Sequence, residues 1–204
     1  MTVATGAEAP KTQSDPLYLR RVLGSGGAPI VVTNRGTAPA WRSVSITGIP
    51  SADLPAEAHG YSVTRNLYRP DGQIADLSKV RQADLLVAVI KGTRTGAPQP
   101  VQTLVVDLLP AGFEIETATV SKGRSTTDYS WLPELTEATY IEERDDRFVA
   151  ALDLKEDTRD FTLAYIVRAV TPGDFKYPAL VAEDMYDPET SGRTALGKLT
   201  IAPR

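Results

Sequence analysis

Short runs rich in Val, Ile, Leu, Thr and Tyr recur along the chain, and glycine and proline separate them. The clearest run is "DFTLAYIVRAV", residues 160–170, in which every second position from Phe161 to Val167 is apolar. The positions between them, from Thr162 to Arg168, are mixed. Because side chains alternate between the two faces of a strand, this period of two predicts a strand with one fully apolar face.

The same pattern predicts strands throughout the chain. The predicted strands are residues 17–23, 29–34, 41–48, 61–68, 84–91, 102–109, 113–120, 147–154, 160–170, 177–183 and 196–202. Long helical periodicity is absent, although "LSKVRQAD" (77–84) and "WLPELTEA" (131–138) are each compatible with a short helix. We therefore predict an all-β protein, built as an antiparallel β-sandwich.

A polar stretch rich in small residues, "SADLPAEAHG" at residues 51–60, has the composition of a linker. About 50 residues precede it, which is near the size at which a separate core is marginal. We expect this N-terminal part to be a small β unit that belongs to a larger domain. The roughly 145 residues that follow are enough for an independent sandwich.

Composition excludes several classes of function. The net charge is −4, so we expect no nucleic-acid partner, because phosphate binding requires a basic surface. No apolar run approaches the roughly 18 to 20 residues that cross a bilayer, and the first 16 residues lack the apolar core of a signal peptide. We therefore expect neither direct membrane insertion nor an export signal in this chain.

The side chains that usually carry catalysis or bind metals are scarce. The chain has no cysteine, which excludes disulfides, thiolate metal sites and cysteine nucleophiles. It has a single histidine, His59, which is too few for a multi-histidine metal site, and we read it as an exposed linker residue. We expect no metal site and no cofactor.

An acidic cluster at residues 142–146, within "YIEERDDRFV", has two interpretations. Glu142, Glu143, Asp145 and Asp146 could bind calcium or provide a carboxylate pair. The alternating charges and the flanking strands favour a charged hairpin turn instead.

Three other residues are candidates for binding or catalysis. Asp107 is a single charge inside the apolar run "LVVDLLPAG", where a structural role is more common than a catalytic one. Trp41 and Trp131 could form a carbohydrate platform, but tryptophans so far apart in sequence are more often core or interface anchors. Without a catalytic constellation, we predict that the chain is not an enzyme.

The stretch "PALVAEDMYDPETSGRT", residues 178–194, begins like a strand and ends like a loop. It places Met185 and Tyr186 where the chain turns outward. The residues alone leave two alternatives: the pair packs into the core of its own sandwich, or it is presented to a partner. Asp184, Asp187 and Pro188 favour a turn, and would support the loop.

Several phrases together resemble the C-terminal region of bacterial alpha-2-macroglobulins. They are "GYSVTRNLYRPDGQIADLSKVRQADLLVAVI", "VVDLLPAGFEIE", "YIEERDDRFVAALDL", "FTLAYIVRAVTPGDF" and "AEDMYDPETSGRT", in that order. The earlier stretch "PIVVTNRGTAPAWRSVSITGIP" is similar to the end of the CUB domain in that family. The resemblance covers nearly all of residues 17–204.

The resemblance implies a division of the chain into domains. Residues 17–57 would be the C-terminal part of a CUB-like β unit, and residues 58–204 the terminal macroglobulin-like sandwich. Residues 1–16 would be a disordered or vector-derived N-terminus.

The resemblance also implies a function that is not catalytic. Family members are periplasmic protease traps, held at the inner membrane by an N-terminal lipid anchor, in which a Cys–Gln thioester captures the attacking protease. The matching domain packs on the thioester-containing domain, and the Met-Tyr pair on its loop covers the thioester. Met185 and Tyr186 hold the matching positions, so the implied partners are the thioester-containing domain of the same parent chain and the trapped proteases. The alternatives are a cell-surface adhesin-like or carbohydrate-binding sandwich, and a hydrolase that uses Asp107 or residues 142–146.

Overall fold

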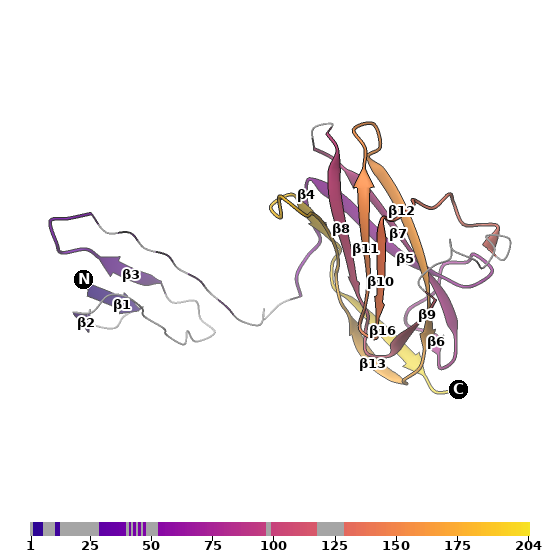
Figure 1. Ribbon diagram of the computed structural model, residues 1–204. Helices are drawn as coiled ribbons and strands as arrows, with labels where there is room; N and C mark the ends of the chain where they lie inside the picture. The colour runs from indigo at the N-terminus through magenta and orange to yellow at the C-terminus, as the bar shows by residue number, and fades with distance from the viewer. Residues whose placement is uncertain are drawn as a thin grey trace. The chain divides into compact units, whose positions relative to one another are not determined.

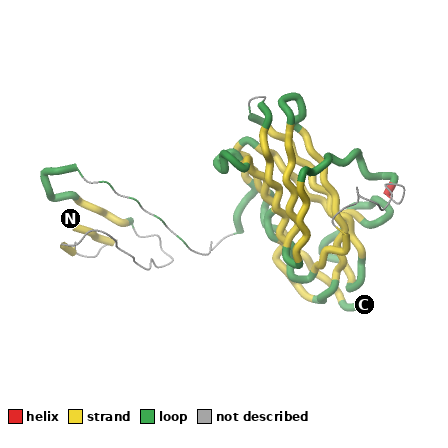
Figure 2. The backbone as a smooth tube through the Cα atoms, viewed as in Figure 1, coloured by secondary structure: helices red, strands yellow, loops and turns green. Residues whose placement is uncertain are grey.

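The computed structural model describes residues 2–5, 11–12, 29–39, 53–96, 99–117 and 129–204, together with residues 41, 43, 45 and 47. The chain divides into two compact units, Met1–Ile49 and Pro50–Arg204. Strands make up most of the second unit, as Figure 2 shows. Among the described residues, no helix is long and apolar enough to cross a membrane.

The first unit contains a three-stranded antiparallel sheet. Its strands, in the order in which they pair, are β2 (Lys11–Thr12), β1 (Thr2–Thr5) and β3 (Ile30–Thr33). Strand β3 confirms the strand predicted at 29–34, whereas β1 and β2 lie in residues 1–16, for which no strand was predicted. A four-residue strand is too short to show a period of two, and β1 depends on pairing with the distant β3. The strand predicted at 17–23 and much of the one at 41–48 lie outside the described residues.

The second unit is a sandwich of two antiparallel sheets (Figure 1). The six-stranded sheet has the order β10 (Tyr140–Arg144), β11 (Arg147–Leu154), β8 (Val101–Leu108), β14 (Leu180–Asp184), β15 (Ser191–Arg193) and β4 (Glu57–His59). The four-stranded sheet has the order β5 (Tyr61–Tyr68), β7 (Leu85–Arg94), β12 (Asp160–Ala169) and β9 (Phe113–Thr117). A small third sheet consists of β13 (Gly173–Tyr177), β16 (Gly197–Ala202) and β6 (Val80–Arg81), with β6 parallel to β16. The predicted all-β, antiparallel sandwich is confirmed.

Two local predictions in this unit were wrong. Residues 77–84 contain strand β6 and turns, and residues 131–138 are turn and extended chain, so neither forms an α-helix. Residues 57–59, predicted as part of a linker, form strand β4, which pairs with β15. In both β4 and β6 the hydrogen-bonding partner is distant in sequence, so the local composition carries no sign of the strand.

The core lies between the two large sheets and is filled by the apolar face that the sequence pattern predicted for residues 160–170. Phe161, Leu163, Tyr165 and Val167 are all buried there. The facing sheet contributes the inward positions of β8, β11 and β14. The largest of these side chains are Val105, Phe148, Leu152 and Leu180.

The outer face of the four-stranded sheet is covered by the chain itself. Val87, Val89, Ala164 and Ile166 on β7 and β12 are buried there. Residues 129–135 cover them with the side chains of Tyr129, Trp131, Leu132 and Leu135. This cover explains why the second face of β12 is also partly apolar.

A buried ion pair joins the two sheets. Arg65 of β5 donates to the Oδ1 carboxylate oxygen of Asp107 on β8, and also to the carbonyl oxygen of Pro178 at 2.9 Å. Tyr165 of β12 donates its hydroxyl to Asp107 Oδ2 at 2.7 Å. The Arg65 guanidinium carbon lies 3.5 Å from the centre of the Tyr177 ring. Three sheets therefore meet at one charged contact.

The pKa directions in this network follow from burial. Burial raises the pKa of Asp107, and the Arg65 charge and the hydrogen bonds from Tyr165 and Arg65 oppose this. Burial also raises the pKa of Tyr165 well above its ordinary value, as does the neighbouring Asp107 charge. Tyr165 therefore keeps its proton and remains a donor to Asp107.

Removal of Arg65 tests how much this contact stabilises the sandwich. Arg65→Met should lower the free energy of unfolding by roughly 3–5 kcal/mol, because it leaves the Asp107 carboxylate buried without its counter-ion. Adding Asp107→Asn should recover part of this loss, since the amide is neutral and can still accept from Tyr165. Urea denaturation of the two variants measures the difference.

The deficit of Arg65→Met should also depend on pH. Burial without a counter-ion holds the folded-state pKa of Asp107 above the unfolded value of about 3.9. Between these values the folded state binds more protons than the unfolded state, so stability is lost as pH rises through the folded pKa and regained as pH falls. If the loss of unfolding free energy in Arg65→Met, measured against the unmodified chain, stays constant from neutral pH to about pH 4, the buried Asp107 charge is not its cause.

Candidate functional site

The loop between β14 and β15 presents the two residues singled out in the sequence. Met185 is 46% exposed and Tyr186 is 81% exposed. Neither belongs to a buried apolar cluster of the described residues. The sequence left two alternatives open. The structure agrees with the one in which Met185 and Tyr186 face solvent, and not with the one in which they pack into the core of the same sandwich.

Asp184 anchors the start of this loop. Its side chain is buried at the end of β14, and its Oδ1 accepts hydrogen bonds from the backbone N–H groups of Tyr186 at 3.0 Å and Asp187 at 3.3 Å. A buried carboxylate that accepts two backbone donors fixes the local turn. The result is a defined backbone path directly beneath Met185 and Tyr186.

The far side of the loop closes on itself. The backbone N–H of Thr190 donates to the Asp187 carbonyl oxygen at 2.9 Å, and its hydroxyl donates to Asp187 Oδ2 at 2.8 Å. The N–H of Asp184 donates to the Thr190 carbonyl oxygen at 3.0 Å. Pro188 lies exposed in the turn between them. Asp184, Asp187 and Pro188 thus all lie in one turn.

The loop is tied to the sandwich at its base. Met185 N–H donates to the Gln102 carbonyl oxygen of β8 at 2.9 Å. Gly192 on β15 lies so close to β5 that an added Cβ would be 2.3 Å from the Tyr61 carbonyl oxygen. Only glycine allows this approach of the two backbones, which holds β15 and the end of the loop against β5.

A second buried polar contact between the sheets lies below the loop. The Tyr61 hydroxyl of β5 and the Thr103 hydroxyl of β8 are 2.7 Å apart and hydrogen-bonded, and both residues are fully buried. Thr103 is also the register partner of Asp184 on β14. Burial raises the pKa of Tyr61, and the nearby Asp184 charge acts in the same direction. Arg94, also buried, lowers it through its charge and a hydrogen bond.

A groove of about 670 Å³ runs beside Tyr186. Its walls come from the loop, from the start of β8 and from the end of β11, with Tyr186, Val101 and Leu154 as its apolar lining. Asp153, Lys155 and Asp187 also line it. The surface around Tyr186 therefore combines one large exposed aromatic side chain with charges, which is typical of a contact surface and not of an enclosed reaction site.

Asp107, one of the catalytic candidates, is fully buried in the ion pair with Arg65. No substrate could reach a carboxylate that is 0% exposed and already occupied by Arg65 and Tyr165. The structure thus supports the structural role favoured from the sequence.

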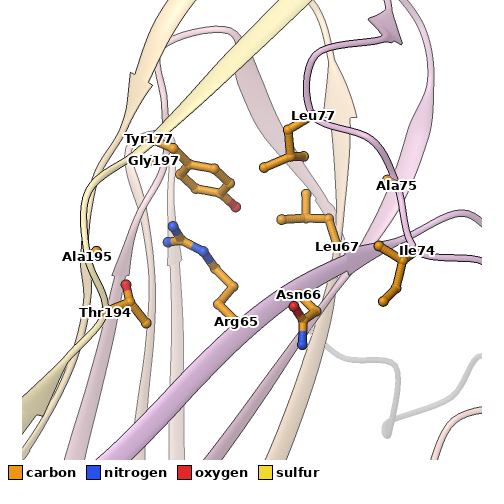
Figure 3. Close-up of a pocket in the computed structure, with 10 residues that line it drawn as sticks. All are labelled: Arg65, Asn66, Leu67, Ile74, Ala75, Leu77, Tyr177, Thr194, Ala195 and Gly197. Atoms are coloured by element: carbon orange, nitrogen blue, oxygen red, sulfur yellow. The ribbon is translucent and has the colours of Figure 1, made fainter. Parts of the chain in front are cut away.

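A hollow of about 220 Å³ lies beside Arg65, and Figure 3 shows its lining. Leu67, Ile74 and Leu77 form one side, and Tyr177 lies over the guanidinium group. The Arg65 charge is already used by Asp107, so this hollow contains no unpaired cation for an anionic ligand.

The acidic cluster forms the turn of the β10–β11 hairpin. Arg144 pairs with Glu142 at 2.6 Å and Arg147 with Asp146 at 2.7 Å. The hydrogen bonds from Arg147 lower the pKa of Asp146. Within the described residues, no group of three or more His, Asp or Glu side chains is arranged to hold a metal ion. The geometry is that of the charged hairpin.

The remaining candidates are dispersed. His59 lies on β4, exposed, with Nε2 3.7 Å from Glu57 Oε2. Trp131 packs on Tyr68 at a ring-centre distance of 5.1 Å and donates to the Pro70 carbonyl oxygen at 3.0 Å. Trp41 is fully exposed and lies in the first unit. Trp131 is thus an anchor of the covering segment, and the two tryptophans do not share a platform within either unit.

Sequence reasoning missed the residues that support the loop from below. Tyr61, Arg94 and Thr103 come from three different strands, β5, β7 and β8. The available signal was weak: Arg65 and Arg94 occupy positions of period-two strands that point inward. A charged residue at an inward position indicates a buried partner, but it does not identify that partner.

Comparison with known proteins places this geometry in a family context. The family model described as "bMG10: Bacterial Alpha-2-macroglobulin MG10 domain" matches residues 60–189. Alpha-2-macroglobulin of Escherichia coli (strain K12) is 35% identical over 179 residues, covering 83% of this chain and 11% of the relative. That of Xylella fastidiosa (strain Temecula1) is 34% identical over 176 residues, covering 82% of this chain and 10% of the relative. The chain thus spans about a tenth of the length of these curated relatives.

Solved structures agree with the sequence matches. Salmonella alpha-2-macroglobulin reacted with methylamine has a TM-score of 0.65 at 32% identity, over 76% of this chain and 10% of that one. Escherichia coli alpha-2-macroglobulin activated by porcine elastase has a TM-score of 0.65 at 30% identity, over 76% and 14%. The native Escherichia coli structure from domain MG7 to the C-terminus has a TM-score of 0.63 at 29% identity, over 76% and 25%.

The anchoring role of Asp184 can be measured directly. Asp184→Ala removes the acceptor for the N–H groups of Tyr186 and Asp187, so their amide hydrogen exchange should become at least about tenfold faster. The fold should lose about 1–2 kcal/mol of stability. Asp184→Asn keeps a side-chain oxygen as acceptor and is the matched control, for which we expect exchange close to that of the unmodified chain. Unchanged exchange in Asp184→Ala would show that the loop does not depend on this carboxylate.

Proposed function

From the premise that this chain belongs to the bacterial alpha-2-macroglobulin family and contains its macroglobulin-like MG10 domain, we propose that it shields the thioester of a longer protease-inhibiting polypeptide. In this role the domain is not a catalyst. It packs on the thioester-containing domain of the same parent chain and keeps water and amines away until a protease cleaves the parent.

One observation carries the proposal: Met185 and Tyr186 are exposed on a loop whose backbone is fixed from beneath. A flexible loop would lose conformational freedom when it docked, and that cost would weaken the contact. Here Asp184 already accepts from the N–H groups of Tyr186 and Asp187. The two side chains are therefore presented in a preformed arrangement, as a lid requires.

The chemistry of the pair suits a thioester. A thioester is hydrolysed by water and attacked by amines, so its cover should be apolar and bulky. Methionine adapts its shape to an irregular surface, and tyrosine provides a large flat face with one polar end. Among the similar structures, the Salmonella protein has been reacted with methylamine and the Escherichia coli protein activated by porcine elastase, which is consistent with such a reactive group in those proteins.

The remaining parts of the proposal come from the family resemblance. We propose that the parent traps proteases and that it is located in the periplasm, held at the inner membrane by an N-terminal lipid anchor. The non-catalytic role is supported by Asp107, which is buried in an ion pair and so unsuited to hydrolysis. Of the two tryptophans on which the carbohydrate-binding alternative depends, Trp131 packs against Tyr68 and donates to the Pro70 carbonyl oxygen, whereas Trp41 is exposed in the first unit.

Removal of the lid side chains tests the proposal. Met185→Ala combined with Tyr186→Ala should barely change the melting temperature of this chain, since Tyr186 lies largely in solvent, Met185 is about half exposed, and neither belongs to a buried apolar cluster of the described residues. In the full-length parent the same change should speed inactivation by methylamine, because removal of the two side chains lets the amine reach the thioester. The buried apolar area lost in the contact corresponds to at most a few kcal/mol, so the parent should stay folded.

Ile74→Ala is the matched control for the lid experiment. Ile74 is 68% exposed but lies in the loop after β5, away from the Asp184–Thr190 loop. It should leave methylamine inactivation of the parent unchanged. A large loss of stability in this chain, together with unchanged amine reactivity in the parent, would show that the pair has a structural role and would refute the lid.

The chain by itself should be inert. It has no cysteine, so it cannot contain the Cys–Gln thioester. We expect no mass increase after incubation with methylamine and no stoichiometric inhibition when the chain is titrated into trypsin. Mass spectrometry and residual trypsin activity measure the two. A stable covalent adduct with trypsin would place the capture chemistry inside this chain and contradict the proposal.

A further inference from the structure

The two outer faces of the sandwich differ in a way that the lid does not explain. On the outer face of the four-stranded sheet, the apolar side chains of β7 and β12 are covered by residues 129–135 of the same chain. The six-stranded sheet presents apolar side chains on its outer face as well. Neither of the two buried apolar clusters in the described residues includes these side chains.

The apolar positions are in register across three neighbouring strands. Val149 of β11 pairs with Val106 of β8, and Val106 pairs with Val181 of β14, so the three form one row across the sheet. In the next row Ala151 lies beside Leu104, and Tyr140 of β10 lies beside Ala151. Strands β8, β11 and β10 lie side by side in Figure 1, and β14 follows β8 in the strand order of the sheet.

The exposure of these residues shows that they point outward. Inward positions of β8, such as Val105 and Asp107, are fully buried. The intervening Leu104 and Val106 are only half-buried, and Leu108 is 38% exposed. Tyr140 is 57% exposed. An aligned apolar patch on the three strands β8, β11 and β14 is unusual for an open face, which normally alternates apolar-in and polar-out.

We infer that this outer face of the six-stranded sheet is an interdomain surface, on which another domain of the same polypeptide packs. The inference rests on the proposed function in one respect, that the chain is a domain of a longer parent. It extends that proposal, because it assigns a contact to the sheet face and not only to the Met185–Tyr186 loop. This surface, the outer β8 face, consists of Leu104, Val106, Leu108, Val149, Ala151 and Val181, with Tyr140 at its edge.

The length of the relatives favours a domain of the same polypeptide. About nine-tenths of the related chains lies outside the matching region, and the match covers 25% of the solved native fragment that runs from domain MG7 to the C-terminus. A domain tethered in the same chain has a high effective concentration, so a modest apolar patch is enough to hold it. A stable dimer of two copies buries about 800 Å² per partner, which is more than seven mostly half-buried side chains provide.

The surroundings of the face are consistent with a single continuous contact surface. The solvent-facing positions of β8 continue from Leu104 to Gln102, which lines the groove beside Tyr186. Asp153, the register partner of Gln102, lines the same groove. At the hairpin end the apolar patch is bordered by two ion pairs, Arg144 with Glu142 and Arg147 with Asp146. On the other side Glu183 of β14 lies beside Leu104. The expected partner is an apolar face with a basic group opposite Glu183.

Cysteine labelling tests this inference, because the chain has no cysteine of its own. Val149→Cys places a thiol in the centre of the outer β8 face. We expect a maleimide to label it at least about tenfold more slowly in the full-length parent than in this chain, as read by peptide mass spectrometry. Val106→Cys, in the same row, gives a second measurement if one variant folds poorly.

The matched control is Ser62→Cys, at an exposed, outward position of β5. Its labelling should differ much less between the parent and this chain. Equal slowing at Ser62→Cys and Val149→Cys, or no slowing at either, overturns the inference. Slower labelling of Val149→Cys in this chain as its concentration rises, with a dimer in sedimentation, also overturns it, since the occupant would then be a second copy.

The outcomes separate this inference from the lid. Protection of Val149→Cys in the parent, with methylamine inactivation unaffected by the Met185 and Tyr186 changes, would keep the interdomain face and reject the lid. Loss of amine protection in the Met185 and Tyr186 variant, with Val149→Cys labelled equally fast in parent and chain, would keep the lid and reject the interdomain face.

Discussion

The buried ion pair between Arg65 and Asp107 is the contact on which the sandwich depends most. It joins the four-stranded sheet to the six-stranded sheet, and through Tyr177 and the Pro178 carbonyl oxygen it also joins the third sheet. Two charges inside an apolar core are costly unless each is fully satisfied. Asp107 is satisfied by Arg65 and Tyr165, so the cost is offset only when all three strands are in their correct places. The pair thus acts as a check on the packing of the sheets as well as a contact between them.

The same two strands carry a second polar contact, and its position connects the fold to the candidate site. Arg65 and Tyr61 are four residues apart on β5, and Asp107 and Thr103 are four residues apart on β8. At a rise of about 3.3 Å per residue, the two contacts lie roughly 13 Å apart along the sandwich. The first fixes the middle of the sheets. The second, between Tyr61 and Thr103, fixes the end from which the Met185–Tyr186 loop extends. The base of the loop is therefore held in place by contacts within the core.

The different treatment of the two outer faces indicates how such a domain can work within a larger chain. On one face, residues 129–135 cover the apolar centre formed by β7 and β12. The other combines an apolar row on β8, β11 and β14 with the exposed Met185 and Tyr186 at one end. A domain that must hold a neighbour in place benefits from one surface that is rigid and partly apolar, because little order has to be gained when the contact forms. Loss of that neighbour would leave the sandwich itself intact, since its core lies on the other side of the sheet.

The sequence by itself determined the class of fold and the main core strands. The period of two at residues 160–170 correctly gave the buried face of β12, and the strands predicted at 61–68 and 147–154 match β5 and β11. Turn-forming residues around Met185 and Tyr186 also marked the candidate loop, because Asp and Pro favour turns through local hydrogen bonds and fixed dihedral angles. These properties depend on neighbours in the chain, which a sequence displays directly.

The tertiary structure alone decided the pairings between distant segments. Strands β4 and β6 are stabilised by β15 and β16, so no local signal predicted them and residues 57–59 and 77–84 were misread. It also decided that Asp107 meets Arg65, and that Met185 and Tyr186 point to solvent while Asp184 is buried beneath them. Each of these outcomes depends on which groups lie within a few ångströms across the sheets. Residues such as Arg65 and Asp107 are brought together by burial and hydrogen bonding although they are more than forty positions apart in the chain. No periodic pattern in a single sequence indicates such a contact.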